Sequence, residues 1–200
     1  MLLNNVSIIL PIIRPEAAIR CIRAIHKNRG CFRGAIQIIA KEDKQRIGAP
    51  KKVKELVGEA NYDLIMFLGD DTIPQYDFLR NAILRMKEFP DGYGLVGLND
   101  QFHKGYPATH WLAHRELLEY FDGEFFHTGY RHCFCDNELT DRCIEMDRYV
   151  WAKDSVILHD HPLVKGESVE GTEYESLYRP DNYYHDQRLY KKRKANKWRT

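Results

Sequence analysis

The chain has 200 residues, enough for one domain with a substantial hydrophobic core. Its 30 basic residues nearly balance its 29 acidic residues, so overall charge gives no reason to expect a nucleic-acid partner. Its five cysteines form neither an even disulfide set nor a paired C-x-x-C zinc pattern, so we expect a reduced, cytoplasmic protein. The apolar stretch over 1–13 is interrupted by polar residues and proline, so we expect no targeting or transmembrane segment.

The first half of the chain alternates predicted strands and helices. A β-branched run over 5–13 predicts a strand buried on both faces, and Pro15 followed by apolar residues at helical spacing predicts the next helix. The same signals predict further strands at 35–40, 62–69 and 93–98, and helices at 50–61 and 76–89. Because parallel neighbours need crossover connections, this alternation predicts an α/β, Rossmann-like domain whose mostly parallel central sheet has helices on both faces.

The second half of the chain is less regular and richer in histidine, tyrosine and acidic residues. One amphipathic helix is predicted near 136–146, where Leu139, Cys143 and Met146 share a face. Beyond Pro162 the pattern decays, and we expect a C-terminal extension over 166–200 after a domain over 1–165.

Two adjacent aspartates, Asp70 and Asp71, follow the predicted strand over 62–69. Ligands of open α/β sheets bind beyond the carboxyl ends of the strands. Two like charges there repel unless a cation or hydrogen-bond donors lie beside them. Carboxylate oxygens suit Mg²⁺ or Mn²⁺, which often share their remaining positions with phosphate oxygens. The pair therefore predicts a metal site for a phosphate-bearing substrate, unless the two residues only cap a turn.

Four segments follow one another along the chain: "VSIILPIIRPEAAIRCIRAI", "YDLIMFLGDDTIPQYDFL", "CDNELTDRC" and "VILHDHP". In order and spacing they resemble the opening strand, the D-x-D segment, the acidic motif and the histidine-bearing strand of family 2 glycosyltransferases of the GT-A fold. The resemblance spans roughly residues 5–165. It implies an inverting hexosyltransferase that uses a nucleotide-sugar donor, with UDP expected, a Mn²⁺ or Mg²⁺ ion, and a carbohydrate or glycan acceptor. It also implies that 1–98 is the nucleotide-sugar-binding half of the domain and 99–165 the acceptor-side half.

The resemblance assigns Asp71 to the metal that bridges the donor diphosphate, and Asp70 to the ribose or the water shell of the metal. Gly69 stands where many family members carry the first acid of the D-x-D motif. His159 or His161 is expected to supply a further ligand, since both lie on one face of a strand and imidazole suits Mn²⁺ better than Mg²⁺.

The ends of the first two predicted strands are expected to face the nucleotide. By the resemblance, Pro11, Ile13 and Arg14 line the base, and Glu42 or Asp43 accepts a hydrogen bond from uracil or ribose. The residues leave the choice between these two acids open.

Inverting sugar transfer needs a base that removes the proton of the acceptor hydroxyl. On the resemblance Asp136 is the candidate base and Glu138 the alternative. Asp136 is also suited to capping the predicted helix, and Cys135 replaces the Glu that many family members carry before it.

The sequence over 191–199 is strongly basic. Clusters of about 4–8 basic residues contact anionic membrane surfaces, and a solvated charged helix is the alternative. Two other functions fit the same fold: a nucleotidyltransferase, although the loop after the first strand lacks the glycines of a phosphate loop, and a non-catalytic nucleotide-sugar or carbohydrate-binding protein.

Overall fold

The computed structural model describes residues 5–199, so the outermost residues of the expected domain and of its extension, 1–4 and 200, lie outside the described part. The strands are β1 (Val6–Ile12), β2 (Ile36–Glu42), β3 (Leu64–Phe67), β4 (Thr72–Pro74), β5 (Leu95–Asn99), β6 (Trp111–His114) and β7 (Tyr149–His159). The α-helices are α1 (Pro15–Lys27), α2 (Ala49–Val57), α3 (Phe78–Met86), α4 (Cys135–Glu145) and α5 (Pro180–Ala195), with short 3₁₀ helices η1 (Arg115–Tyr120) and η2 (Pro162–Lys165).

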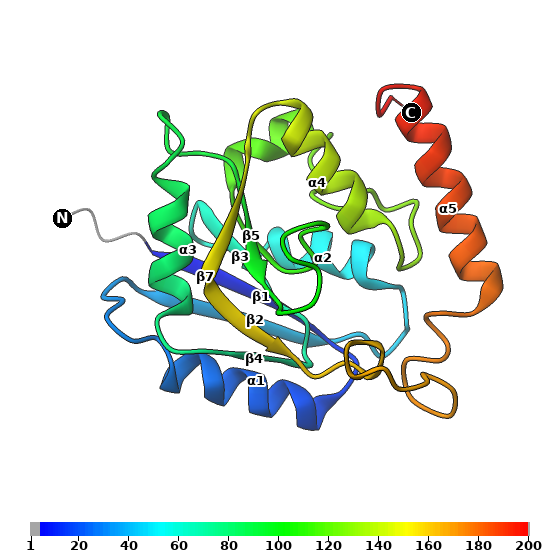
Figure 1. The fold of residues 1–200 in the computed structure, drawn as a ribbon, viewed down its shortest axis with the longest axis horizontal. Helices are drawn as coiled ribbons and strands as arrows, with labels where there is room; N and C mark the ends of the chain where they lie inside the picture. Colours follow the sequence, from blue (N-terminus) through cyan, green and yellow to red (C-terminus); the bar gives the residue numbers. More distant parts are fainter. Residues whose placement is uncertain (1–4, 200) are drawn as a thin grey trace.

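Within the described residues the strands form one sheet in the order β2-β1-β3-β6-β5-β7-β4 (Figure 1). β1 runs parallel to β2 and β3, and β5 runs parallel to β7. β6 is antiparallel to β3 and β5, and β4 is antiparallel to β7. The sheet is therefore mixed, and the expectation of a mostly parallel sheet was wrong. The reason is that β6 follows β5 without a crossover helix, and strands joined without a crossover pair antiparallel.

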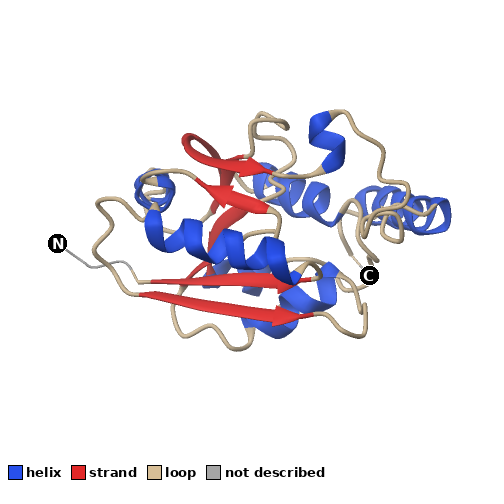
Figure 2. Cartoon of the chain, turned by 90° about the horizontal axis from the view of Figure 1, so that it is seen from below, coloured by secondary structure: helices blue, strands red, loops and turns tan. Residues whose placement is uncertain are grey.

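Helices cover both faces of the sheet, as the alternating pattern predicts (Figure 2). Successive residues of β1 point to opposite faces, so Ile8 packs into a core with α1 and α3, while Ile9 packs into a core with α2 and α4. Both side chains are fully buried. Burial on both faces explains why this strand is a continuous apolar run rather than an alternating one.

The sequence predicts β1, β2, β3 and β5 and the helices between them, with differences of a few residues at their ends. The helix predicted over 76–89, for example, spans Phe78–Met86. β4 and β6 are not predicted as elements, and α5 is anticipated only in part, by the charged helix that is the alternative for 191–199. β4 and β6 have three and four residues, too few for a periodic pattern to be recognised.

Helix α5 is held against the domain by charged side chains, together with Leu189 and Tyr190, which pack against the core that contains Leu139 of α4. Arg193 donates two hydrogen bonds of 2.8 Å to Glu138, and both side chains are 4% exposed. Lys194 pairs with Asp141 at 2.6 Å. Two of the basic residues expected to face membrane or solvent are therefore paired within the protein. α5 lies beside α4 in Figure 1.

No helix in the described part of the chain combines the length and the apolarity needed to cross a bilayer.

Candidate functional site

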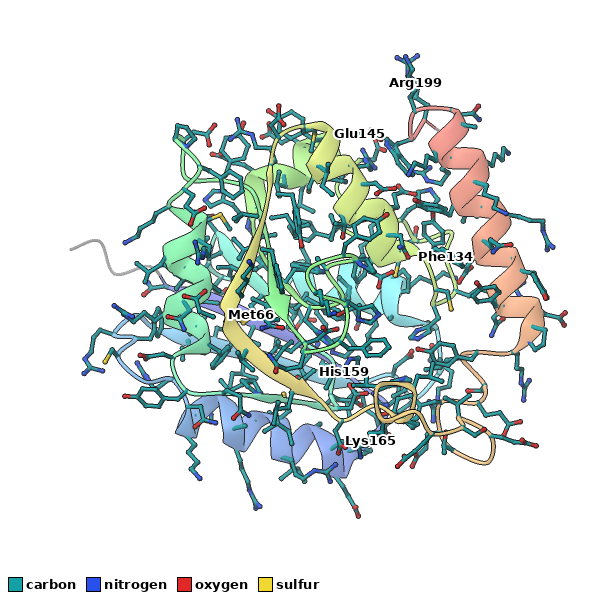
Figure 3. The ribbon with its side chains drawn as sticks, viewed as in Figure 1. Met66, Phe134, Glu145, His159, Lys165 and Arg199 are labelled. Carbon is teal, nitrogen blue, oxygen red and sulfur yellow. The ribbon has the colours of Figure 1, made fainter. Side chains whose placement is uncertain are left out.

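A cavity of about 480 Å³ opens where β1, β2 and β3 end together. Its floor includes Arg14, Asp43 and Asp71, each of which lies just past the carboxyl end of one of these strands. The start of α4 and the end of β7 form other parts of the wall, and Figure 3 shows Phe134 and His159 at these two places. This is the edge at which open α/β sheets bind their ligands.

The register of β4 on β7 places Asp71 beside His159. Thr72 is the residue paired with His159, and the backbone amide of Asp160 donates to the Asp71 carbonyl at 2.8 Å. The His159 Nε2 atom consequently lies 3.4 Å from Asp71 Oδ2.

The register of β3 on β6 brings a second histidine to the same place. Phe67 pairs with Trp111, so His110 stands opposite the chain that leads into Gly69. A Cβ atom on Gly69 would lie 2.7 Å from Asp71 Oδ1 and 3.0 Å from His110 Nε2. The first of these distances is shorter than a normal contact, so a side chain at position 69 would displace the Asp71 carboxylate.

Asp71, His110 and His159 form a group that could hold a metal ion. One ligand atom from each lies within 4.8 Å of the other two. Burial alone would raise the pKa of the Asp71 carboxyl, but contact with His159, together with Arg14, holds that pKa well below its usual range. Burial lowers the pKa of His110 to about 3. An ionised carboxylate and a neutral imidazole are the forms that bind metals.

The donor set of this group fits a divalent transition metal. One carboxylate oxygen and two imidazole nitrogens suit Mn²⁺ and its neighbours better than Mg²⁺, which prefers oxygen ligands alone. The Nε2 atom of His159 is the nitrogen that faces Asp71, whereas its buried Nδ1 atom has no hydrogen-bond partner among the described residues.

Arg14 supplies a positive charge between the two aspartates. Its side chain pairs with Asp70, and its Nη1 atom lies 3.2 Å from Asp71 Oδ2. The backbone amides of Ile13 and Arg14 also donate to Asp70, at 2.8 and 2.7 Å. Burial opposes the charge of Arg14, but Asp71 and Asp70 raise its pKa above the ordinary value. Asp70 is thus engaged in holding the loop after β1, and the repulsion between the two acids is offset within the protein.

Residues beyond Pro162 cover one side of the cavity. The Tyr174 hydroxyl donates to Asp71 Oδ2 at 2.7 Å, and the Arg14 guanidinium lies 4.0 Å from the centre of the Tyr174 ring. His161 begins η2: its Nδ1 atom accepts from the backbone amide of Leu163 at 3.1 Å, and its Nε2 atom lies 3.3 Å from the Tyr178 hydroxyl. His161 is therefore outside the three-residue group that contains His159.

The residues expected to contact the nucleotide divide into two sets. Pro11, Ile13 and Arg14 line the cavity, as does Asp43, whose carboxylate accepts from two backbone amides of the loop leading to α2 at 3.0 Å. Glu42 is exposed and lies outside the cavity lining, 3.8 Å from Lys44.

The two candidate bases have different environments. Asp136 lines the cavity, and the backbone amide of Asn137 donates to its carboxylate at 2.9 Å. Burial raises the pKa of Asp136. Glu138 lies outside the cavity lining, where it accepts from Tyr130 at 2.8 Å and from Arg193. Of these two candidates, Asp136 is the one that lines the cavity.

Known structures share this arrangement of elements, although no model of a known family and no curated protein matches the sequence. The mannosyltransferase PcManGT from Pyrobaculum calidifontis, in complex with GDP-Man and Mn²⁺, superposes with a TM-score of 0.63 at 15% identity, over 94% of this chain and 64% of that one. TarS from S. aureus, in complex with UDP, gives 0.59 at 11%, over 76% and 59%. A glycosyltransferase involved in glycosylation of the major capsid of PBCV-1 gives 0.50 at 10%, over 92% and 98%.

The chain has a glycosyltransferase fold. It spans 64% and 59% of the length of the first two structures. At identities of 10–15% the likeness establishes this fold, whereas the roles of individual residues depend on the geometry of the cavity.

His110 was not among the site residues expected from the sequence of this glycosyltransferase fold. It precedes the unpredicted strand β6, and no spacing in the sequence links it to Asp71. The available signal was the segment "HWLAH", in which a histidine stands at each end of a short apolar run.

Proposed function

We propose that this chain transfers a hexose from a nucleoside-diphosphate sugar to a hydroxyl group of a carbohydrate or glycan acceptor. The observation that carries the proposal is the presence, in one cavity at the strand ends, of the Asp71, His110 and His159 group together with the carboxylate of Asp136. The fold supports it, because one structure of this fold is a mannosyltransferase with GDP-Man and Mn²⁺ and another holds UDP.

Asp71, His110 and His159 would hold the metal, with Mn²⁺ proposed ahead of Mg²⁺ because two of the three donors are imidazole nitrogens. When bound, such an ion stabilises negative charge on a departing diphosphate. Arg14 adds a fixed positive charge beside Asp71, and preorganised charge of this kind acts strongly in a site from which water is excluded.

Asp136 is the proposed base of an inverting single displacement. It would accept the proton of the acceptor hydroxyl as that oxygen attacks the anomeric carbon. Its raised pKa makes it a stronger base than an exposed aspartate, and it faces the cavity. Glu138 is assigned to holding α5 in place, because Arg193 occupies both of its oxygens.

UDP is the proposed nucleotide, on the resemblance of the sequence to family 2 glycosyltransferases. The wall formed by Pro11, Ile13, Arg14 and Asp43 would take the base and ribose. A cytoplasmic location is part of the proposal, since all five cysteines are described and free.

Thermal unfolding with nucleotides tests the proposal. UDP, GDP and the corresponding sugars are added with and without Mn²⁺, and the Tm is measured. A ligand at 100 times its Kd stabilises the native state by about 2.7 kcal/mol, so a metal-dependent rise is expected with at least one nucleotide. The rise should be lost in Asp71→Ala and kept in Asp63→Ala, which removes an acid whose side chain is 75% exposed.

The absence of a shift with every nucleotide would contradict the proposed function. A nucleotide-sugar that binds, but is never turned over with any acceptor in a glycan panel, would instead leave a binding protein with this fold. Release of pyrophosphate from a nucleoside triphosphate would indicate a nucleotidyltransferase.

A further inference from the structure

A short hydrogen-bonded chain of side chains lies behind His110. The Thr109 hydroxyl donates to Asp100 Oδ2 at 2.9 Å, and the same hydroxyl lies 3.1 Å from His110 Nδ1. Asp100 is 2% exposed and His110 is 3% exposed, and Thr109 between them is partly buried and lines the cavity.

Asp100 is fixed in position by the loop that it begins. Its Oδ1 atom accepts from the backbone amides of Phe102 and His103 at 3.0 and 2.8 Å. Its Oδ2 atom lies 2.5 Å from His103 Nδ1. A carboxylate that receives this many donors is an acceptor in all of its contacts, including the one to Thr109.

The direction of the hydrogen bonds from Thr109 determines which nitrogen of His110 carries the proton. The Thr109 hydroxyl has one hydrogen, which it gives to Asp100, so it can only accept from His110. The proton of the neutral imidazole is therefore on Nδ1, and Nε2 keeps a free lone pair. Nε2 is the atom that faces Gly69, and the Cβ position that lies 3.0 Å from it also lies 2.7 Å from Asp71 Oδ1.

Gly69 completes the arrangement on the other side of His110. A methyl group there would lie 3.0 Å from His110 Nε2 and 2.7 Å from Asp71 Oδ1. The position at which a D-x-D motif has its first acid is thus left without a side chain, and the imidazole of His110, the residue before β6, approaches it instead.

We propose that Asp100 and Thr109 are positioning residues that hold His110 as an Nε2 metal ligand, and that Gly69 provides the space for it. The resulting group of two histidines and one carboxylate would select Mn²⁺ or a similar borderline ion over Mg²⁺. This inference rests on the metal site of the proposed function. Outer hydrogen-bond partners of ligating histidines are known to set the tautomer and the ring orientation in the same way.

Direct titration of metal into the full chain tests the inference without any measurement of activity. Mn²⁺ and Mg²⁺ are titrated into the wild type, Thr109→Val and Thr109→Ser by calorimetry. Thr109→Val keeps the shape of the side chain but removes the hydroxyl, and should weaken Mn²⁺ binding roughly 10–100-fold. Thr109→Ser keeps the hydroxyl and should bind as the wild type does, as should His26→Gln, which alters an exposed histidine on α1.

Nitrogen-15 NMR of the metal-free wild type provides a second measurement that needs no variant. The His110 shifts should show a protonated Nδ1 and an unprotonated Nε2. A merely structural role for Thr109 would not fix this tautomer. Gly69→Ala should weaken Mn²⁺ binding in the same way as Thr109→Val, with an unchanged circular dichroism spectrum.

The outcomes separate this inference from the proposed function. In the first case the wild type binds Mn²⁺ and responds to nucleotide. The inference alone is then overturned if Thr109→Val binds Mn²⁺ equally well, or if His110 is protonated on Nε2. A wild type that binds no Mn²⁺ but shows the nucleotide shift would overturn the inference and the metal site together. A wild type with neither response would overturn the proposed function as well.

Discussion

Thr72 and His159 are paired residues in the antiparallel ladder between β4 and β7, and this pairing places the Asp71 carboxylate 3.4 Å from the His159 ring. Because side chains alternate along a strand, a slip of one residue would turn His159 to the opposite face and remove it from the cavity. The site therefore depends on the register of a strand with only three residues.

The two histidines at the end of β7 should differ in their effect on metal binding. His159→Asn removes a proposed ligand and should weaken Mn²⁺ binding by at least about 100-fold, more than the loss of an outer partner. His161→Asn should leave the Mn²⁺ affinity close to that of the wild type, because His161 caps η2. Calorimetric titration measures both, and the reverse order of effects would show that His161 is the ligand.

Asp136→Asn should separate donor binding from turnover. The amide cannot accept a proton from the acceptor, so the transfer rate should fall by about 10²–10⁴-fold. The nucleotide-dependent Tm shift should remain, since Asp136 is not among the proposed metal ligands. If transfer survives in Asp136→Asn and is abolished in Glu138→Gln, Glu138 is the base.

Arg193→Met should destabilise the fold without affecting the metal site. It leaves the buried Glu138 carboxylate without its main partner, and breaking a buried ion pair costs on the order of 3 kcal/mol. The loss is measured as the free energy of unfolding in urea. Lys192→Met, at an exposed position of the same helix, should change that free energy by less than about 0.5 kcal/mol. Equal stability of the two variants would argue against α5 being held by this pair.

The pairing of His103 with Asp100 should make a small part of the stability depend on pH. Burial lowers the pKa of His103, but the Asp100 carboxylate outweighs this and raises it above 6.5. A raised folded-state pKa means that the contribution is complete below about pH 6.5 and is lost as pH rises through the folded value. Because the His103 side chain is 29% exposed, the contribution should not exceed about 1 kcal/mol.

Comparison of the wild type with His103→Gln at several pH values measures this contribution. The difference in Tm should be larger at pH 6 than at pH 9. A difference that stays constant, or that grows with pH, would show that the charge of His103 does not stabilise the loop.

Several elements could be predicted because their pattern is local. The apolar run of β1, and the helical spacing of α1 and α2, depend on residues close together in the sequence. β6 could not be predicted, since its four residues become a strand through pairing with β3 and β5. Only the end of α5 was anticipated, as a charged helix over 191–199, because its buried anchors, Asp186 and Arg193, are charged residues whose partners come from other segments.

The sequence by itself determined the alternation of strands and helices, and it placed two aspartates at the edge where ligands bind. The tertiary structure alone decided that Asp70 holds a loop while Asp71 faces His159. It also decided that His110 lies in one group with Asp71 and His159. The physical reason is the range of the interactions involved. Hydrophobic periodicity acts over a few residues, whereas a ligand group forms only when the registers of β3 on β6 and of β4 on β7 bring distant side chains within contact distance.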